Sequence, residues 1–309
     1  MLRYIFHRFL MMIFVLVGVS FIVYSLMDLA PGDIVSMMAP QDATEVEIAM
    51  LRKEWGLEGT LVERYSRYMG KLLKGDLGIS PSLKKPVIEV FFTRFPETLK
   101  LAFASIFVAL LISVPLGIAA ATHHRSWLDG ASMVAAMLGL SMPGFWLGLL
   151  FIMGFSLKLG WFPSGGSSGL ISLVLPAVTL GVSQAGNLTR ITRSSMLEVI
   201  RQDYLRTARA KGVSEKMVIR KHALYNALIP ILTVFGSTLG NAFGGAVAIE
   251  TVFAWPGVGR LTVQAINSRD IPLTTGCIIM FTMFLTLTLL VVDIAYAYVD
   301  PRIKARYLQ

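Results

Sequence analysis

The chain of 309 residues is 55% hydrophobic and only 15% charged, with a formal net charge of +9 and a mean hydropathy of +0.66. Soluble proteins contain about 25% charged residues, so this composition excludes an ordinary soluble domain and indicates a membrane protein. Basic loops retained inside the cell explain the positive charge, and we expect no nucleic-acid partner. A single cysteine, Cys277, excludes an internal disulfide and any Cys-based metal site.

Six uncharged stretches are each long enough to cross a membrane. A hydrocarbon core of about 30 Å requires about 20 helical residues. We therefore predict an all-α integral membrane protein with six transmembrane helices. No A-x-A cleavage site follows the first stretch, which favours a retained helix over a signal peptide. Pro176 interrupts the fourth stretch, which is the weakest. The six stretches are Phe9–Met27, Leu101–Thr122, Ala131–Leu157, Leu170–Thr189, Ala223–Ile249 and Ile271–Val292.

Basic residues gather at the chain ends and in two loops that share one side of a six-span arrangement. They are Arg3 and Arg8, Arg125, nine Lys/Arg within 190–221, and Arg302, Lys304 and Arg306. Because Lys and Arg are retained in the cytoplasm, we expect both termini to be cytoplasmic. The segment 31–96 would then lie outside. Within it, Glu45–Gly56 and Leu61–Leu73 have apolar residues at helical spacing, which predicts short amphipathic helices on the membrane or on a partner.

The most informative stretch lies between the fourth and fifth spans, at about 190–228. It is strongly basic and has Gly212 near its middle. Glycine can adopt the left-handed conformation that ends a helix, and Ser214 is then a suitable N-cap for the next one. We predict two short helices joined at Gly212, shaped to dock a partner. A solvated basic hairpin that only fixes topology is the alternative. One apolar helical face is expected to contain Met196, Val199, Ile200 and Tyr204.

This stretch resembles the "EAA" loop of ABC importer permeases. The run R-T-A-R-A-K-G at 206–212, followed by H-A-L at 222–224, is similar to the form found in the dipeptide, oligopeptide and nickel branch. Arg206 stands where the general pattern has Glu, and His222 where it has Ile. The resemblance implies that an ATPase subunit contacts this loop through Arg206, Thr207, Ala208, Ala210, Lys211, Gly212, His222 and Leu224.

Further runs carry the same resemblance along the whole chain. They are Met1–Tyr4, Leu29–Asp33, Arg190–Met196, an outer-loop signature with Glu250, Pro256, Gly257, Gly259 and Arg260, and the ending Val299–Arg302. The resemblance implies the type I importer fold in the plasma (inner) membrane of a prokaryote. Its divisions would be an N-terminal helix (1–30), an extracytoplasmic segment (31–96), a transmembrane domain of five helices (97–300) and a cytoplasmic tail (301–309).

The function implied by the resemblance is that of a permease subunit. It would form half of the pathway for short peptides delivered by an extracytoplasmic solute-binding protein. Its other partners would be a second homologous permease and two cytoplasmic ATPase subunits. The chain has no Walker A pattern, so we expect no enzyme activity, no cofactor and no metal here, with ATP and Mg²⁺ held by the ATPases. Nickel chelate or glutathione are alternative cargoes. An ion-coupled secondary transporter is the alternative of another class. Such a transporter is expected to have inverted repeats and intramembrane carboxylates, which this sequence does not show convincingly.

Polar side chains at membrane depth are the candidate lining of the pathway. Such residues usually face the interior of the bundle or a wet cavity. Gly236, Gly240 and Gly244 are spaced four apart, which permits close helix packing, either with a second permease or within the chain. The candidate lining residues are Ser183, Gln184 and Asn187 in the fourth span, with Ser237 and Asn241 in the fifth.

Overall fold

The computed structural model describes residues 2–29, 35, 44–54 and 58–299. The predicted tail 301–309 and most of the run Leu29–Asp33 lie outside the described residues. The chain divides into two compact units. One unit contains Thr98–Trp255 and the end of the chain after Thr286, and the other contains Leu2–Glu97 and Pro256–Thr286.

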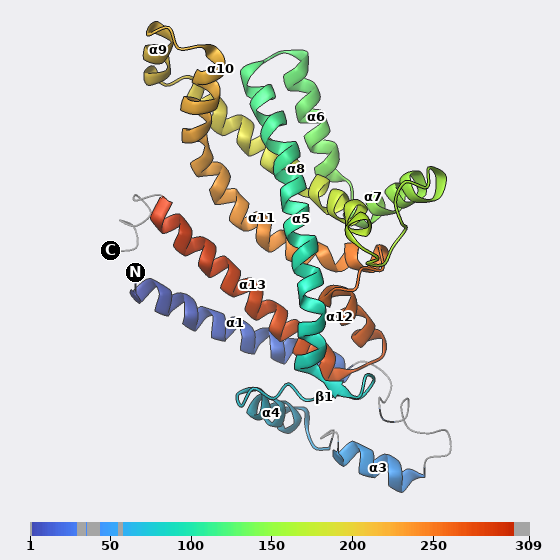
Figure 1. Cartoon of the computed structure of the whole chain (residues 1–309). Coiled ribbons are helices and arrows are strands. Elements are labelled where there is room, and N and C mark those ends of the chain that lie inside the picture. Colours follow the sequence, from blue (N-terminus) through green and yellow to red (C-terminus); the bar gives the residue numbers. More distant parts are fainter. Residues whose placement is uncertain (1, 30–34, 36–43, 55–57, 300–309) are drawn as a thin grey trace. The chain divides into compact units, whose positions relative to one another are not determined.

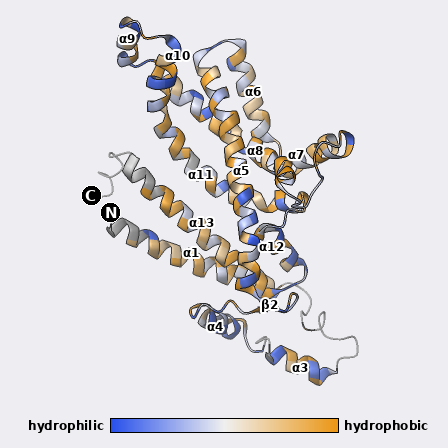
Figure 2. Cartoon of the chain, viewed as in Figure 1, coloured by the Kyte–Doolittle hydropathy of each residue, from blue (hydrophilic) through white to orange (hydrophobic). Residues whose placement is uncertain are grey.

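Five of the described helices are long and apolar enough to cross a membrane, and a bent pair of helices, if counted as one span, makes a sixth. Figure 2 shows the apolar residues running along the long helices. All five of these helices run past their predicted bounds at one end or both, since turns with charged residues beyond the apolar core continue the helix. The long helices are α1 (Leu2–Leu29), α5 (Val87–Thr122), α8 (Leu170–Ile200), α11 (Leu224–Val252) and α13 (Ile271–Val299).

The third predicted span, Ala131–Leu157, is not one straight helix. It is divided into α6 (Trp127–Ser141), α7 (Gly144–Phe151) and a π-helical turn (Ile152–Lys158), with a bend of 101° between α6 and the rest. The cause lies in the local sequence. A residue before proline avoids the helical region, and Met142, which precedes Pro143, is extended at φ −80° and ψ 127°.

Helix α8 is packed closely against α5 and α6 through glycines (Figure 1). A Cβ atom on Gly181 would lie 2.7 Å from the carbonyl oxygen of Ser105 in α5. A Cβ on Gly186 would overlap the carbonyl oxygen of Ala136 in α6. Small residues of this kind let helix backbones approach within a membrane. Pro176 is accommodated inside α8 rather than ending it, so the fourth span is continuous.

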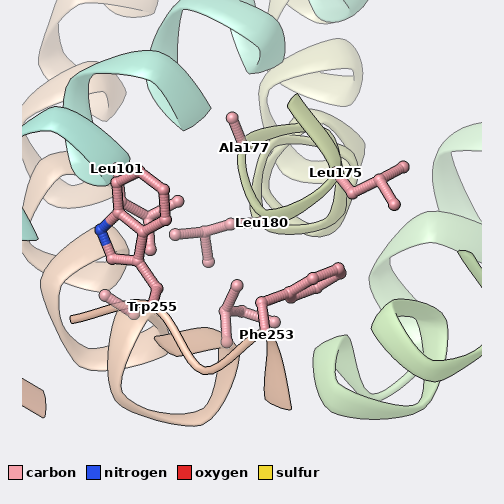
Figure 3. Packing of buried hydrophobic residues seen from close by; sticks show 8 residues of the cluster. Leu101, Leu175, Ala177, Leu180, Phe253 and Trp255 are labelled. Atoms are coloured by element: carbon pink, nitrogen blue, oxygen red, sulfur yellow. The ribbon is translucent and has the colours of Figure 1, made fainter. Parts of the chain in front are cut away.

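A cluster of buried apolar side chains joins the first turns of α8 to the end of α11. Figure 3 shows Leu180 among Leu101, Phe253 and Trp255, all of which are buried. Ala246 and Ile249 complete the α11 side of the cluster. This cluster fixes one end of the α8–α11 pair, and the candidate site described below lies at the other end of the same two helices.

In the second unit, the amphipathic helix α4 (Leu61–Leu72) covers part of α1. The ring of Tyr65 contacts Tyr24 at a centroid distance of 5.8 Å, and Arg64 forms an ion pair of 2.6 Å with Asp28. A capping box at Thr60 and Glu63 starts α4. The other short helix of this segment is α3 (Glu45–Glu54), and the unit also contains α12 (Val258–Asn267). The structure therefore gives α4 a partner within the chain.

A buried carboxylate holds the short hairpin β1 (Ile79–Ser80) and β2 (Lys85–Pro86) in place. Asp270, which precedes α13, is fully buried. Its Oδ2 accepts hydrogen bonds from the hydroxyls of Ser80 and Ser82, each at 2.5 Å, and from the Ser82 backbone N–H at 3.1 Å. Its Oδ1 accepts from the Leu273 N–H at 2.9 Å and caps the helix.

We expect Ser82→Ala to destabilise this unit by about 1.5 kcal/mol, because a hydrogen bond to a charged group contributes more than one between neutral groups. Ser66→Ala is the matched control, since that exposed hydroxyl only donates to the Glu63 carbonyl of its own helix. Thermal unfolding in detergent measures both. Equal unfolding midpoints for the two variants would show that the hydroxyl of Ser82 does not hold the hairpin.

Candidate functional site

The connection between α8 and α11 consists of short helical segments around a glycine. These are α9 (Asp203–Ala210), α10 (Glu215–Met217) and a π-helical turn (Val218–Ala223). Figure 1 shows α9 and α10 together beyond the end of α8. Gly212 has φ +78°, as predicted from its position between two helices. The Gly212 N–H donates to the Arg209 carbonyl at 2.9 Å and closes the end of α9.

The inner face of this connection is apolar and fully buried. Leu205 and Val218 are both 0% exposed and pack with Met196, Ala223 and Ala227. The sequence predicted Tyr204 on this face, and that prediction is wrong, because Tyr204 is 44% exposed. Helix α8 ends at Ile200 and α9 begins at Asp203, so the helical register restarts and turns Leu205 inward.

The outer face presents most of the residues that the sequence motif singled out. Arg206, Thr207, Ala210, Lys211 and Gly212 are exposed, whereas Ala208, His222 and Leu224 are half-buried. Two large side chains that the motif did not name are also exposed, Met217 at 51% and Tyr225 at 73%. The exposed surface thus combines basic groups with apolar and aromatic ones, a composition typical of protein interfaces.

An ion pair bridges the glycine turn. Arg209 donates from Nε at 2.9 Å and from Nη2 at 2.8 Å to the two carboxylate oxygens of Glu215. The Arg209 guanidinium lowers the pKa of Glu215 below its usual value. Ser214 occupies the N-cap position that the sequence predicted, but its side chain makes no capping hydrogen bond. The Arg209–Glu215 pair, together with the buried Leu205 and Val218, sets the angle between α9 and α10.

The candidate pathway residues lie on two helices, α8 and α11. Both polar atoms of the Gln184 side chain are buried without a hydrogen-bond partner among the described residues. Ser183 donates to the Thr179 carbonyl, and Asn187 accepts from Arg190 at 3.1 Å. Ser237 and Asn241 are exposed on α11.

The residues of the outer-loop signature fall in two different settings. Glu250 belongs to the last turn of α11 rather than to a loop, is fully buried, and accepts a hydrogen bond of 2.7 Å from the Thr98 hydroxyl. Pro256 and Gly257 precede α12, and Gly259 and Arg260 lie in its first turn. The chain passes from one compact unit to the other between Trp255 and Pro256.

Sequence reasoning missed an ion pair between the buried Asp129 at the start of α6 and the half-buried Arg193 near the end of α8. Arg193 Nε lies 2.6 Å from Asp129 Oδ1. Arg193 stood in the run 190–196 that resembles the permease family, but Asp129 was not singled out. The available signal was an acidic residue just before an apolar span and a few residues after the basic run His123–Arg125.

We expect opposite reagent accessibility at the two ends of α8. Ser167 precedes α8 and Ser214 lies in the glycine turn, and both are exposed. If basic loops are retained inside, an impermeant thiol reagent should label Ser167→Cys in intact cells and should label Ser214→Cys only after lysis. The native Cys277 is 0% exposed and provides an internal unreactive control. If the reagent labelled Ser214→Cys and not Ser167→Cys in intact cells, the predicted orientation in the membrane would be wrong.

Comparisons with known proteins bear on the whole chain. The family described as "Binding-protein-dependent transport system inner membrane component" matches residues 113–305, and its N-terminal component matches residues 1–102. The glutathione transport system permease protein GsiC of Salmonella paratyphi A is 40% identical, with 98% of this chain and 99% of that protein covered. The oligopeptide transport system permease protein AppB of Bacillus subtilis is 38% identical, with 98% and 100% covered.

A solved structure shares the fold. The inward-facing MetNI methionine ABC transporter contains a chain with a TM-score of 0.60 and 20% identity, covering 68% of this chain and 96% of that one. The fold, the apolar spans and the relatives define a non-catalytic, multi-pass permease subunit of an ATP-driven importer, whose ATP is hydrolysed by separate subunits. The chain belongs to the family of binding-protein-dependent transport system inner membrane components. This assignment decides against an ion-coupled secondary transporter.

Proposed function

We propose that this chain forms half of a translocation pathway for short peptides, paired with a second homologous permease. Two cytoplasmic ATPase subunits, which hold ATP and Mg²⁺, and an extracytoplasmic binding protein complete the assembly. One observation carries the proposal: relatives named for glutathione and for oligopeptides are 40% and 38% identical over almost the whole chain. Glutathione is itself a tripeptide, although its first amide joins the glutamyl side chain, so both names describe cargo that contains amide bonds.

The chemistry of the candidate pathway residues supports this cargo. Side-chain amides can both donate and accept hydrogen bonds, which suits a peptide backbone irrespective of its side chains. Gln184 offers two buried polar atoms that lack a partner in the described chain, and a buried polar group without a partner is costly. Ser183 and Asn187 lie on the same helix, and Ser237 and Asn241 are exposed on α11. These five residues are the proposed lining.

The proposed contact with the ATPase is the exposed face of α9 and α10. It contains Arg206, Thr207, Ala210, Lys211 and Gly212, with the partly covered Ala208, His222 and Leu224 behind them. We add Met217 and Tyr225, because large exposed side chains of this kind anchor interfaces. A turn fixed by a buried apolar face and by an ion pair transmits displacement better than a flexible loop. In this assembly both chain termini and this contact face the cytoplasm.

Uptake by the complete complex in proteoliposomes tests the proposal. We expect ATP-dependent uptake of reduced glutathione or tetra-alanine that requires the binding protein, and little uptake of Ni²⁺ with or without a histidine chelator. Isothermal titration of the isolated binding protein with the same compounds identifies the preferred cargo. Nickel uptake that greatly exceeds peptide uptake would contradict the peptide assignment while leaving the family unchanged.

A further inference from the structure

The contact between Asp129 and Arg193 is more buried than the other ion pairs described in its unit, including the bidentate pair of Arg209 and Glu215. Arg193 donates to Asp129 through Nε at 2.6 Å and through Nη2 at 2.7 Å, so the pair is bidentate. The Asp129 side chain is 7% exposed and that of Arg193 is 24% exposed. The pair between Arg206 and Asp203, in contrast, spans 3.7 Å with both side chains exposed, and such exposed pairs contribute little.

Two further groups contact the carboxylate of Asp129. The backbone N–H of Arg125 donates to its Oδ2 at 3.0 Å, and Nδ1 of His124 lies 3.2 Å from the same oxygen. Nη2 of Arg193 also lies 3.2 Å from Nδ1 of His124. The loop before α6, the first turn of α6 and α8 therefore meet at one carboxylate. The guanidinium of Arg193 comes from a different helix, so Asp129 does more than stabilise the first turn of α6.

The position of the pair within the unit gives it mechanical importance. Arg193 lies in the part of α8 that runs on to Ile200 and then, after two residues, into α9. Asp129 lies at the start of α6, which continues beside α8 to the bend at Met142. The same two helices also approach closely at Gly139 beside Val182 and at Gly186 beside Ala136, where the contacts are of the van der Waals type. Such contacts have no preferred direction along the helix axis, whereas a bidentate ion pair fixes both rotation and sliding.

We infer that Asp129 and Arg193 are positioning residues that make α6 and α7 follow the end of α8 when α9 and α10 are displaced. This inference rests on the proposed role of α9 and α10 as the ATPase contact. The pair converts a displacement of the connection into a movement of the bent helix pair. Without the pair, hydrolysis moves α8 while α6 follows it incompletely. Loss of the pair therefore separates ATP hydrolysis from transport instead of abolishing both.

The experiment measures cargo transported per ATP hydrolysed in proteoliposomes of the complete complex. Arg193→Lys retains the charge but loses the two-pronged geometry, and Asp129→Asn retains the size but loses the charge. We expect each to lower the transport-to-hydrolysis ratio by about three- to tenfold, and the double variant to be no worse than either single one. Arg125→Lys is the matched control. The side chain of Arg125 is exposed, and the substitution leaves unchanged both the charge of the loop and the backbone N–H that donates to Asp129. It should keep the wild-type ratio.

A second readout does not depend on cargo. Spin labels on Trp127 and Ser194, both exposed, report the distance between the start of α6 and α8. We expect a distance independent of ATP in the wild-type complex and a second, ATP-dependent distance in Arg193→Lys. The inference is overturned if the label distance in Arg193→Lys is single and does not change with ATP. It is also overturned if transport and hydrolysis fall in equal proportion, or if only the amount of assembled complex falls. If the wild type transports neither peptide, the peptide assignment fails while the label distances still decide the role of the pair.

Discussion

Gly212→Val should abolish coupled transport while leaving the chain inserted in the membrane. Gly212 has φ +78°, a conformation in which a β-branched residue is strained by about 1–3 kcal/mol. Space is not the obstacle, because a Cβ added at Gly212 meets nothing within 4 Å. The strain is relieved if the turn changes conformation, which alters the angle between α9 and α10 and misplaces their exposed face. We expect uptake to fall at least tenfold, measured as ATP-dependent accumulation in proteoliposomes.

Two variants separate this effect from a general loss of folding. Gly212→Asn should retain most of the transport, because Asn tolerates the left-handed conformation. Gly130→Val introduces the same side chain at an exposed position of α6 where a Cβ also meets nothing within 4 Å and φ is not positive. It should transport normally. Wild-type uptake by Gly212→Val with normal ATPase binding would show that the conformation of this turn is irrelevant to coupling.

Gly181→Val should prevent stable assembly of the unit that contains α5, α6 and α8. A Cβ at this position would lie 2.7 Å from the Ser105 carbonyl oxygen and 2.8 Å from the Val108 Cβ. The first of these atoms is backbone, so relief requires α5 and α8 to move apart. Overpacking of this kind costs about 1–3 kcal/mol, and separation of the helices adds the loss of neighbouring contacts. The thermal unfolding midpoint in detergent and the monodisperse fraction measure the effect.

The control for this prediction is a comparison of two alanine variants, Gly130→Ala and Gly181→Ala. Alanine favours a helix over glycine by about 1 kcal/mol, so the exposed Gly130→Ala should be neutral or slightly stabilising. Gly181→Ala should instead lower the unfolding midpoint, because the same methyl group meets the α5 backbone. If both alanine variants were equally stable, α5 and α8 would not be in the close contact described above.

Much of the fold could be predicted because it depends on local chemistry. Charge-free stretches gave five of the spans, and the left-handed Gly212 followed from its place between two helical patterns. The break at Met142 was missed because a count of uncharged residues does not distinguish a straight helix from a bent one. The rule for residues before proline could have located it. The boundaries failed for a related reason, since a helix continues through charged turns outside the apolar core.

The candidate site was harder to predict where it depends on contacts between distant segments. Tyr204 was placed on the wrong face because the interruption at Arg201 and Gln202 resets the helical period. Asp129 and Arg193 are 64 residues apart, and no periodicity connects them. The full burial of Glu250 likewise depends on the packing of α11 with residues of other segments.

The continuity of α8 has a geometric consequence for alternating access. At 1.5 Å per residue its 31 residues extend over about 46 Å, which exceeds the thickness of the hydrocarbon core. A rigid rod of that length that tilts by about 5° around its middle moves each end by about 2 Å, in opposite directions. A small angular input at the α9 end would thus narrow a passage on one side of the membrane while widening it on the other. Close packing at Gly181 against α5 and at Gly186 against α6 supports α8 along this length.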